Sequence, residues 1–401
     1  MLFEQERHEP LTPTIWDESS ARATIERIVK DTTDRFTPER LWPVHPLDNL
    51  SGVVLPQPFK MLYFGAAGVI WALDYLARVG ATEIQRDFSS TVAELLEWNR
   101  KDVRPFAPEM SSLLIGDVGI LLLQWKLAPS ESLATQLSDA IEANERHPAR
   151  EFMWGAPGTM LAALLLHERT QEPRWAALFR RSVGQLWKEL EFVSEPACVL
   201  WTQELFGARS MLVGAVHGFA GNVFPVIRAR HLLEPQEWNS WSRHIGQTIE
   251  ATALHDRLYA NWPQSVGVPR PGRTALLVQH CHGAPGIVNC LADFPDSGID
   301  DLLTAAGELT WAAGPLRKGP NLCHGTAGNG FAFLKLFRRA QDSRWLDRAR
   351  AFAMHAMAQS ERHAEAYGQY RYSLWTGDLG LALYLWCCIH AEAWFPTMDV
   401  F

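Results

Sequence analysis

Hydrophobic residues along this chain follow two kinds of helical pattern. In the first kind, found for example at residues 90–103, 174–192 and 343–360, apolar side chains recur every three or four positions and charged side chains occupy the opposite face. Stretches of the second kind lie between them and are apolar almost continuously. The amphipathic pattern predicts outer helices with one solvated face, and the apolar pattern predicts inner helices that are covered on most sides.

Each of the apolar stretches begins with the same short motif, Gly-x-x-Gly. The motif occurs seven times, with its first glycine at positions 65, 116, 155, 218, 283, 325 and 377. The intervals are long enough for two helices and their connections. Seven pairs of an outer and an inner helix predict an all-α fold, an (α/α) double toroid closed into a ring. Glycine at the start of each inner helix permits close backbone approach where the ring converges.

The seven inner-helix N-termini are expected to face a common central cavity. Because unpaired N–H groups give a helix N-terminus a partial positive charge, such a cavity would favour thiolates, carboxylates and phosphates. The repeats set the predicted domain organisation, with the toroid over residues 58–401. Residues 1–57 lack a glycine pair, carry six prolines and include one or two helices around residues 19–36, and we interpret them as an N-terminal extension.

Composition narrows the class of protein. The chain has 401 residues, of which 47% are hydrophobic and 20% are charged, as expected for a globular protein with a large core. The net charge is -8 and no cluster of Lys and Arg resembles a phosphate-binding surface, so we expect no nucleic-acid partner. No apolar stretch approaches the roughly 18 residues that a membrane span needs, and a cytoplasmic location is therefore expected.

The six cysteines are too few for a disulfide scaffold in a chain of this length. Cys290, Cys387 and Cys388 lie in apolar runs, and we expect them to be buried as small hydrophobic residues. The other candidates for chemistry are concentrated at three of the seven glycine motifs. These three are VHGFAG with His217, HCHGAPG with Cys281 and His282, and LCHGTAG with Cys323 and His324.

Two Cys-His-Gly triplets at equivalent repeat positions predict a metal site. Zinc is the expected ion, one per chain, because thiolate and imidazole are its preferred ligands, and three protein ligands leave one tetrahedral position open for a reactant. The spacing does not decide between His282 and His324 as the third ligand. The alternative is that these residues are buried cysteines and helix-capping histidines without a metal.

The sequence resembles the lanthionine synthetase C-like (LanC-like) family, which includes lantibiotic cyclases and their glutathione-binding relatives. The resemblance rests on GAVHGFAGN, NWPQSVG, HCHGAPGIVN, KGPNLCHGTAGNG and YSLWTGDLG, which are spread from about Gly65 to Trp386. It implies a double toroid of fourteen helices and a zinc ion held by Cys281, Cys323 and His324. It also implies an acid or base at His217.

This residue set suits the addition of a thiol to dehydroalanine or dehydrobutyrine. A free thiol has a pKa of about 8.5, and coordination to zinc deprotonates it at neutral pH. Attack on the alkene then builds negative charge that needs stabilisation and finally a proton at the α-carbon, which His217 could deliver. The expected partners are glutathione or a cysteine-containing peptide, and a peptide or protein that carries a dehydroamino acid.

Departures from the cyclase pattern favour the glutathione-using relatives. The aspartate that cyclases carry shortly before the third glycine motif is not evident in REFMWGAPG, where Glu151 is the nearest acid, and Leu277 stands where cyclases place an arginine. Lys318 and Arg317 precede Cys323 at a place where relatives have a basic residue facing an anionic ligand, so both are predicted to bind substrate.

Three other functions were weighed against thiol addition by this chain. The first is a true lantibiotic cyclase that forms lanthionine rings within a peptide. The second is a non-catalytic, zinc-stabilised scaffold protein, which would close its metal site with a fourth protein ligand. The third is a glycoside hydrolase on a helical toroid, for which the glycine motifs offer no convincing carboxylate pair.

Overall fold

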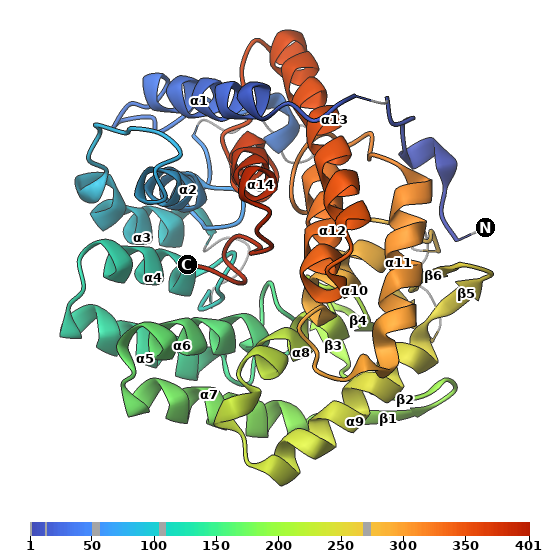
Figure 1. Ribbon diagram of the computed structural model, residues 1–401. Helices are drawn as coiled ribbons and strands as arrows, with labels where there is room; N and C mark the ends of the chain where they lie inside the picture. The colour runs from blue at the N-terminus through green and yellow to red at the C-terminus, as the bar shows by residue number, and fades with distance from the viewer. Residues whose placement is uncertain (1, 13, 50–56, 104–109, 268–273) are drawn as a thin grey trace.

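A computed structural model describes the chain except for residues 1, 13, 50–56, 104–109 and 268–273. The described residues form fourteen α-helices in two concentric layers, which close into a ring (Figure 1). The outer helices are α1 (Glu18–Asp34), α3 (Ser89–Val103), α5 (Glu131–Asn144), α7 (Pro173–Lys188), α9 (Pro235–Thr252), α11 (Asp300–Ala313) and α13 (Ser343–Tyr367). The predicted all-α toroid is confirmed.

The inner helices all start at the predicted glycine motifs. They are α2 (Ala66–Arg78), α4 (Asp117–Leu127), α6 (Ala156–Thr170), α8 (Phe219–Arg228), α10 (Ala284–Leu291), α12 (Thr326–Ala340) and α14 (Asp378–His390). The first glycine of each motif is the N-cap residue of its helix. Most side chains of these helices are buried, as their apolar sequences require.

The second glycine of each motif allows the preceding loop to fold back onto the first turn of the inner helix. A Cβ atom at any of these seven positions would lie 1.8–2.4 Å from the carbonyl oxygen of the residue six positions earlier, as for Gly328 and Leu322. Unusual dihedral angles are needed at only one of the N-caps, Gly283, with a φ of 101°. The glycines are thus required mainly for close contact with the chain's own preceding loop.

Helix α1 lies within residues 1–57 and packs in the outer layer. It contacts α14 and α13, so it closes the ring between the last repeat and the first (Figure 1). Ala21, Ile25 and Ile28 are fully or almost fully buried on its inner face. Tyr372 donates its hydroxyl to Asp31 at 2.6 Å across the same contact. The region predicted to be an extension therefore contributes an outer helix to the ring.

Short antiparallel strands interrupt the helices, and the sequence patterns did not predict them. They are β1 (Glu191–Ser194), β2 (Ala197–Leu200), β3 (Gln203–Leu205), β4 (Ala208–Leu212), β5 (Leu254–Asp256), β6 (Tyr259–Asn261) and β7 (Ser265–Val266). They form the hairpins β1–β2 and β5–β6, together with a three-stranded sheet in the order β3-β4-β7. No helix in the described part of the chain is long and apolar enough to cross a membrane.

Candidate metal centre

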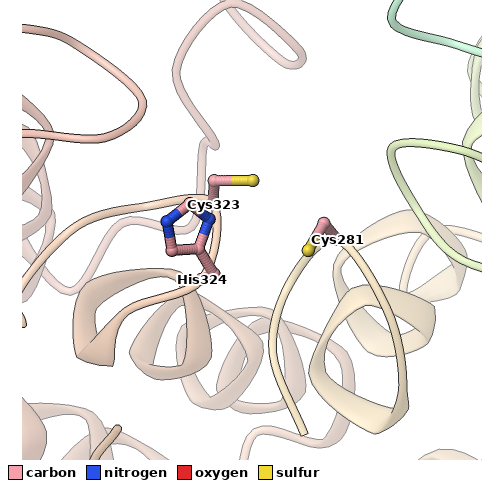
Figure 2. A group of neighbouring side chains, drawn as sticks. All are labelled: Cys281, Cys323 and His324. Atoms are coloured by element: carbon pink, nitrogen blue, oxygen red, sulfur yellow. The ribbon is translucent and has the colours of Figure 1, made fainter. Parts of the chain in front are cut away.

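Two thiols and an imidazole meet where the loops before α10 and α12 face each other. The ligand atoms of Cys281, Cys323 and His324 all lie within 4.8 Å of one another. The Cys281 side chain is directed toward the other two from the neighbouring loop (Figure 2). Both cysteines are buried and His324 is partly buried. Two sulfur donors and one nitrogen donor at this spacing could hold a single metal ion of the zinc type.

Backbone hydrogen bonds hold these loops in register around the ring. The Cys281 N–H donates to the Cys323 carbonyl at 3.1 Å, and the Cys323 N–H donates to the Trp375 carbonyl at 3.0 Å. The series continues from Trp375 to Tyr63 at 3.0 Å and from Tyr63 to Leu114 at 2.9 Å. Each of these five residues stands two positions before the first glycine of its motif. The two cysteines therefore occupy the same position in adjacent repeats.

The electrostatic environment separates the two thiols. A hydrogen bond with Cys323 lowers the pKa of Cys281 to about 7, with further help from the positive charges of His217 and Lys318 and a hydrogen bond from Gln279, against the cost of burial. Burial raises the pKa of the Cys323 thiol, and so does its pairing with Cys281. The environment therefore favours the thiolate form at Cys281 over the thiolate form at Cys323.

His324 is kept in the form that a metal ligand needs. Burial, together with the smaller effect of the neighbouring positive charges of Lys318 and Arg371, lowers the pKa of its imidazole to about 4. The ring is therefore neutral at pH 7 and offers a lone pair. The His324 N–H donates to Oδ1 of Asn321 at 3.0 Å, which fixes the backbone beside the cluster.

The two predicted substrate residues, Lys318 and Arg317, are placed differently. Lys318 is exposed, yet it lies close enough to the cluster to lower the pKa values of Cys281, Cys323 and His324. Arg317 donates its Nε–H to the carbonyl of His8 at 2.8 Å, so part of its guanidinium anchors the N-terminal segment. A role for either side chain in substrate binding stays a prediction.

His217 forms an acid–base pair with Glu151. Its Nδ1 lies 2.8 Å from Oε2 of Glu151, which is completely buried and also accepts the N–H groups of Met153 at 3.1 Å and Trp154 at 2.6 Å. Because a carboxylate only accepts hydrogen bonds, Nδ1 carries a proton and Nε2 is the atom that can exchange one. Glu151, the acid nearest to the third glycine motif in the sequence, is thus the carboxylate that contacts His217.

His282 is placed beside His217 and is not a member of the cluster. The two rings lie 5.8 Å apart between centroids and are nearly parallel, with an angle of 26°. This geometry favours His324 as the third ligand, which the spacing of the sequence left undecided. The assignment of His324 as a metal ligand stays a prediction.

Family membership follows from comparison with known proteins. The family model described as lanthionine synthetase C-like protein matches residues 59–400. The chain belongs to this family. It is 26% identical over 332 residues to glutathione S-transferase LANCL1 of Danio rerio, covering 76% of this chain and 78% of that protein. It is also 39% identical over 103 residues to LanC-like protein GCL1 of Arabidopsis thaliana, covering 23% of this chain and 22% of that protein.

A solved structure shares the fold of this LanC-like chain. The structure of nisin cyclase superposes with a TM-score of 0.62 and 16% sequence identity, covering 84% of this chain and 90% of the cyclase. At this identity the similarity concerns the fold alone. It agrees with the closed ring of seven helix pairs.

Two side chains next to the cluster were not predicted from the LanC-like motifs. Tyr63 comes from the loop before α2, is 7% exposed and forms a hydrogen bond with Cys323. Gln279 donates its amide to Sγ of Cys281 at 2.8 Å. Tyr63 reaches the cluster only because the ring closes, and no local pattern indicates that. Gln279 is two residues before Cys281, and this adjacency was the only available signal.

Proposed function

We propose that this protein adds a thiol, from glutathione or a peptide cysteine, to dehydroalanine or dehydrobutyrine and so forms a thioether. The observation that carries the proposal is the position of the His217–Glu151 pair beside the Cys281, Cys323 and His324 cluster. A metal–thiol site and an acid–base pair are the two components that such an addition needs. Family membership and the similarity to glutathione S-transferase LANCL1 support it.

Zinc is the proposed ion, held by Cys281, Cys323 and His324. Bound to this set with one position open, it would deprotonate an incoming thiol at neutral pH. Lys318 is the side chain best placed to attract an anionic thiol donor such as glutathione, because its charge acts on all three ligands. Tyr63 and Gln279 orient the two cysteine sulfurs through hydrogen bonds.

The reaction requires one proton at carbon. The thiol sulfur forms a bond to the β-carbon, the carbon–carbon double bond breaks, and the electron pair moves toward the adjacent carbonyl. His217 then delivers a proton from Nε2 to the α-carbon, and the carboxylate of Glu151 stabilises its charged form through Nδ1. The proton lost by the thiol is returned to His217 through solvent, so atoms and charges balance.

The test is an addition assay with a metal measurement on the same samples. The protein is incubated with glutathione and a dehydroalanine peptide, and the adduct is quantified by mass spectrometry. We expect one zinc per chain, loss of zinc and of activity in Cys281→Ala, and full zinc in the control Cys198→Ala, whose buried cysteine lies outside the cluster.

His217→Asn separates catalysis from metal binding. We expect it to retain zinc and to react about 100- to 10,000-fold more slowly, the usual contribution of a positioned acid or base. Turnover at the wild-type rate would reduce His217 to a helix-capping residue. Addition by a zinc-free protein at the full rate would overturn the proposal, and zinc without any thiol binding would support the scaffold alternative.

Intramolecular ring formation is the second candidate function. The pairing of Glu151 with His217 favours it, because a missing acid was one of the two departures from the cyclase pattern. A peptide that carries both a cysteine and a dehydroalanine distinguishes the two reactions. A cyclase closes the ring without a change of mass and blocks alkylation of the cysteine, whereas the intermolecular enzyme adds glutathione.

A further inference from the structure

A cavity lies beside His217 on the side of the site formed by β3, β4 and the loop before α6. Its volume is about 300 Å³. Its walls include Trp154, Leu205, Phe206 and Leu212, and the rings of His217 and His282 reach into the same space. No Asp, Glu, Lys or Arg side chain lines it within the part of the chain that the structure describes.

Phe206 stands on this cavity in an unfavourable backbone conformation. Strands β3 and β4 pair from Leu205 to Ala208, so Phe206 and Gly207 form a two-residue turn with φ values of 51° and 72°. Turns of this kind favour Asn-Gly, and a bulky side chain at positive φ is strained. The side chain is 77% exposed, so burial in the protein does not compensate for the strain. Strain of this kind is concentrated at ligand-binding sites.

The aromatic wall is directly connected to the acid–base pair. Phe206 meets Trp154 edge to face, with ring centroids 5.4 Å apart and planes at 89°. The backbone N–H of Trp154 donates to the carboxylate of Glu151, which in turn accepts a hydrogen bond from His217. A group packed against these two aromatic rings would therefore lie next to His217, the residue proposed to protonate the product.

Two positive charges near the cluster come from residues that do not line this cavity. Lys318 and Arg371 act on His324 with positive charge, which suits an anionic thiol donor. The apolar wall of the cavity is complementary to an apolar group, although Ser210, Gln264 and Ser265 also line the cavity. At about 300 Å³ it is at the lower end of the range for ligand pockets and holds one side chain with its adjoining peptide.

We propose that this cavity binds the electrophilic peptide, with an aromatic or large aliphatic side chain next to the dehydroamino acid packed against the rings of Trp154 and Phe206. The inference rests on the proposed function and specifies its acceptor. It assigns the thiol donor to the neighbourhood of Lys318 and the apolar acceptor segment to the cavity beside Phe206. Phe206 is a specificity-determining residue in this arrangement.

The experiment compares acceptor peptides that differ only in the residue beside dehydroalanine, either Phe, Gly or Glu. We expect kcat/KM to favour Phe over Gly by about 10-fold or more, as for other apolar specificity pockets, and Glu to be the poorest. Phe206→Asn should remove most of this preference. Asparagine tolerates positive φ, so this variant should melt no lower than the parent, and loss of the fold cannot explain the result.

Phe192→Ala is the matched control. Phe192 is 73% exposed on β1, a different hairpin, and does not line the cavity, so its variant should keep both the rate and the preference. A preference for Phe that is unchanged in Phe206→Asn would overturn the inference, and so would equal rates with Phe and Gly in the parent.

Binding of an unreactive analogue makes the outcome independent of the reaction. Alanine replaces dehydroalanine in the same peptides, and affinity is measured by calorimetry. If no peptide reacts but the Phe analogue binds more tightly than the Gly analogue and Phe206→Asn removes the difference, the proposed function fails and the cavity assignment holds. If the peptides react while the Phe and Gly analogues bind equally, the proposed function holds and the cavity assignment fails.

Discussion

Glu151 acts on His217 through a single hydrogen bond, yet its position depends on three donors. The N–H groups of Met153 and Trp154 and the Nδ1–H of His217 converge on its buried carboxylate. The sequence identified Glu151 only as the acid nearest to the third glycine motif. Its contact with His217 depends on how the third and fourth glycine motifs come together in the fold, which a pattern within the third motif does not encode.

Replacement of this carboxylate should impair proton transfer without affecting metal binding. In Glu151→Gln the amide can no longer stabilise a charged His217, and we expect the addition rate to fall by about 100-fold or more with full zinc content. The rate is measured against pH with glutathione and a dehydroalanine peptide. Glu204→Gln, an exposed carboxylate on β3, is the control. A wild-type rate and pH profile in Glu151→Gln would exclude a positioning role for Glu151.

Metal affinity should depend on pH in a way that reflects the two unlike thiols. The pKa of Cys281 is lowered to about 7 and that of Cys323 is raised, whereas His324 titrates near pH 4. Above pH 7 metal binding displaces mainly the Cys323 proton, and below pH 7 it displaces a proton from each cysteine. Affinity must therefore fall as pH decreases, and more steeply below pH 7.

Competition with a chelator between about pH 5 and 8 measures this dependence. Lys318→Ala should shift the curve to higher pH, because the Lys318 charge lowers the pKa of both thiols. An affinity that stays constant over this range is incompatible with two thiol ligands.

At the scale of the element, the glycine pairs show what a repeated motif can and cannot predict. All seven inner-helix starts were located from the sequence, because an N-cap followed by an apolar run is a local signal. The physical role of the second glycine could not be predicted from the sequence, because the carbonyl oxygen that it contacts belongs to a loop whose path depends on the fold. The strands were missed because runs of two to five residues are too short to show a period.

Alanine substitutions should have opposite effects at two kinds of helical glycine. In Gly328→Ala the new Cβ would lie 1.8 Å from the Leu322 carbonyl oxygen, and we expect the free energy of unfolding to fall by about 3 kcal/mol or more. Gly246 lies in α9 with nothing within 4 Å of the added atom, so Gly246→Ala should stabilise the protein by about 0.5–1 kcal/mol. Denaturant titration measures both changes. Equal effects would refute the close-contact explanation.

At the scale of the whole molecule, α1 determines whether the ring is a single cooperative unit. If residues 1–57 were an independent extension, their loss of structure would leave the toroid intact. Instead α1 packs on α13 and α14 through a fully buried face. The sequence indicated the helix but not its partners, because contact between the first and last repeats is a property of ring closure.

Truncation of one buried side chain on α1 tests this cooperativity. Ile28→Ala should lower the free energy of unfolding by about 2–5 kcal/mol and keep a single thermal transition by calorimetry and by tryptophan fluorescence. Glu26→Ala, on the exposed face of the same helix, should change stability by less than about 0.5 kcal/mol. Separate melting of α1 ahead of the other helices would show that the extension is an independent unit.

The series of backbone hydrogen bonds from Cys281 to Leu114 shows that the two cysteines of the candidate metal centre occupy a position that recurs around the ring. The position two residues before the first glycine is occupied in four further repeats by Cys323, Trp375, Tyr63 and Leu114. The spacing between neighbouring positions is therefore set by the backbone of the ring and not by the side chains. A designer could therefore move the two thiols by one repeat along the ring by exchanging the side chains at this position. The backbone geometry repeats around the ring, and the sequence determines which repeats carry the two thiols.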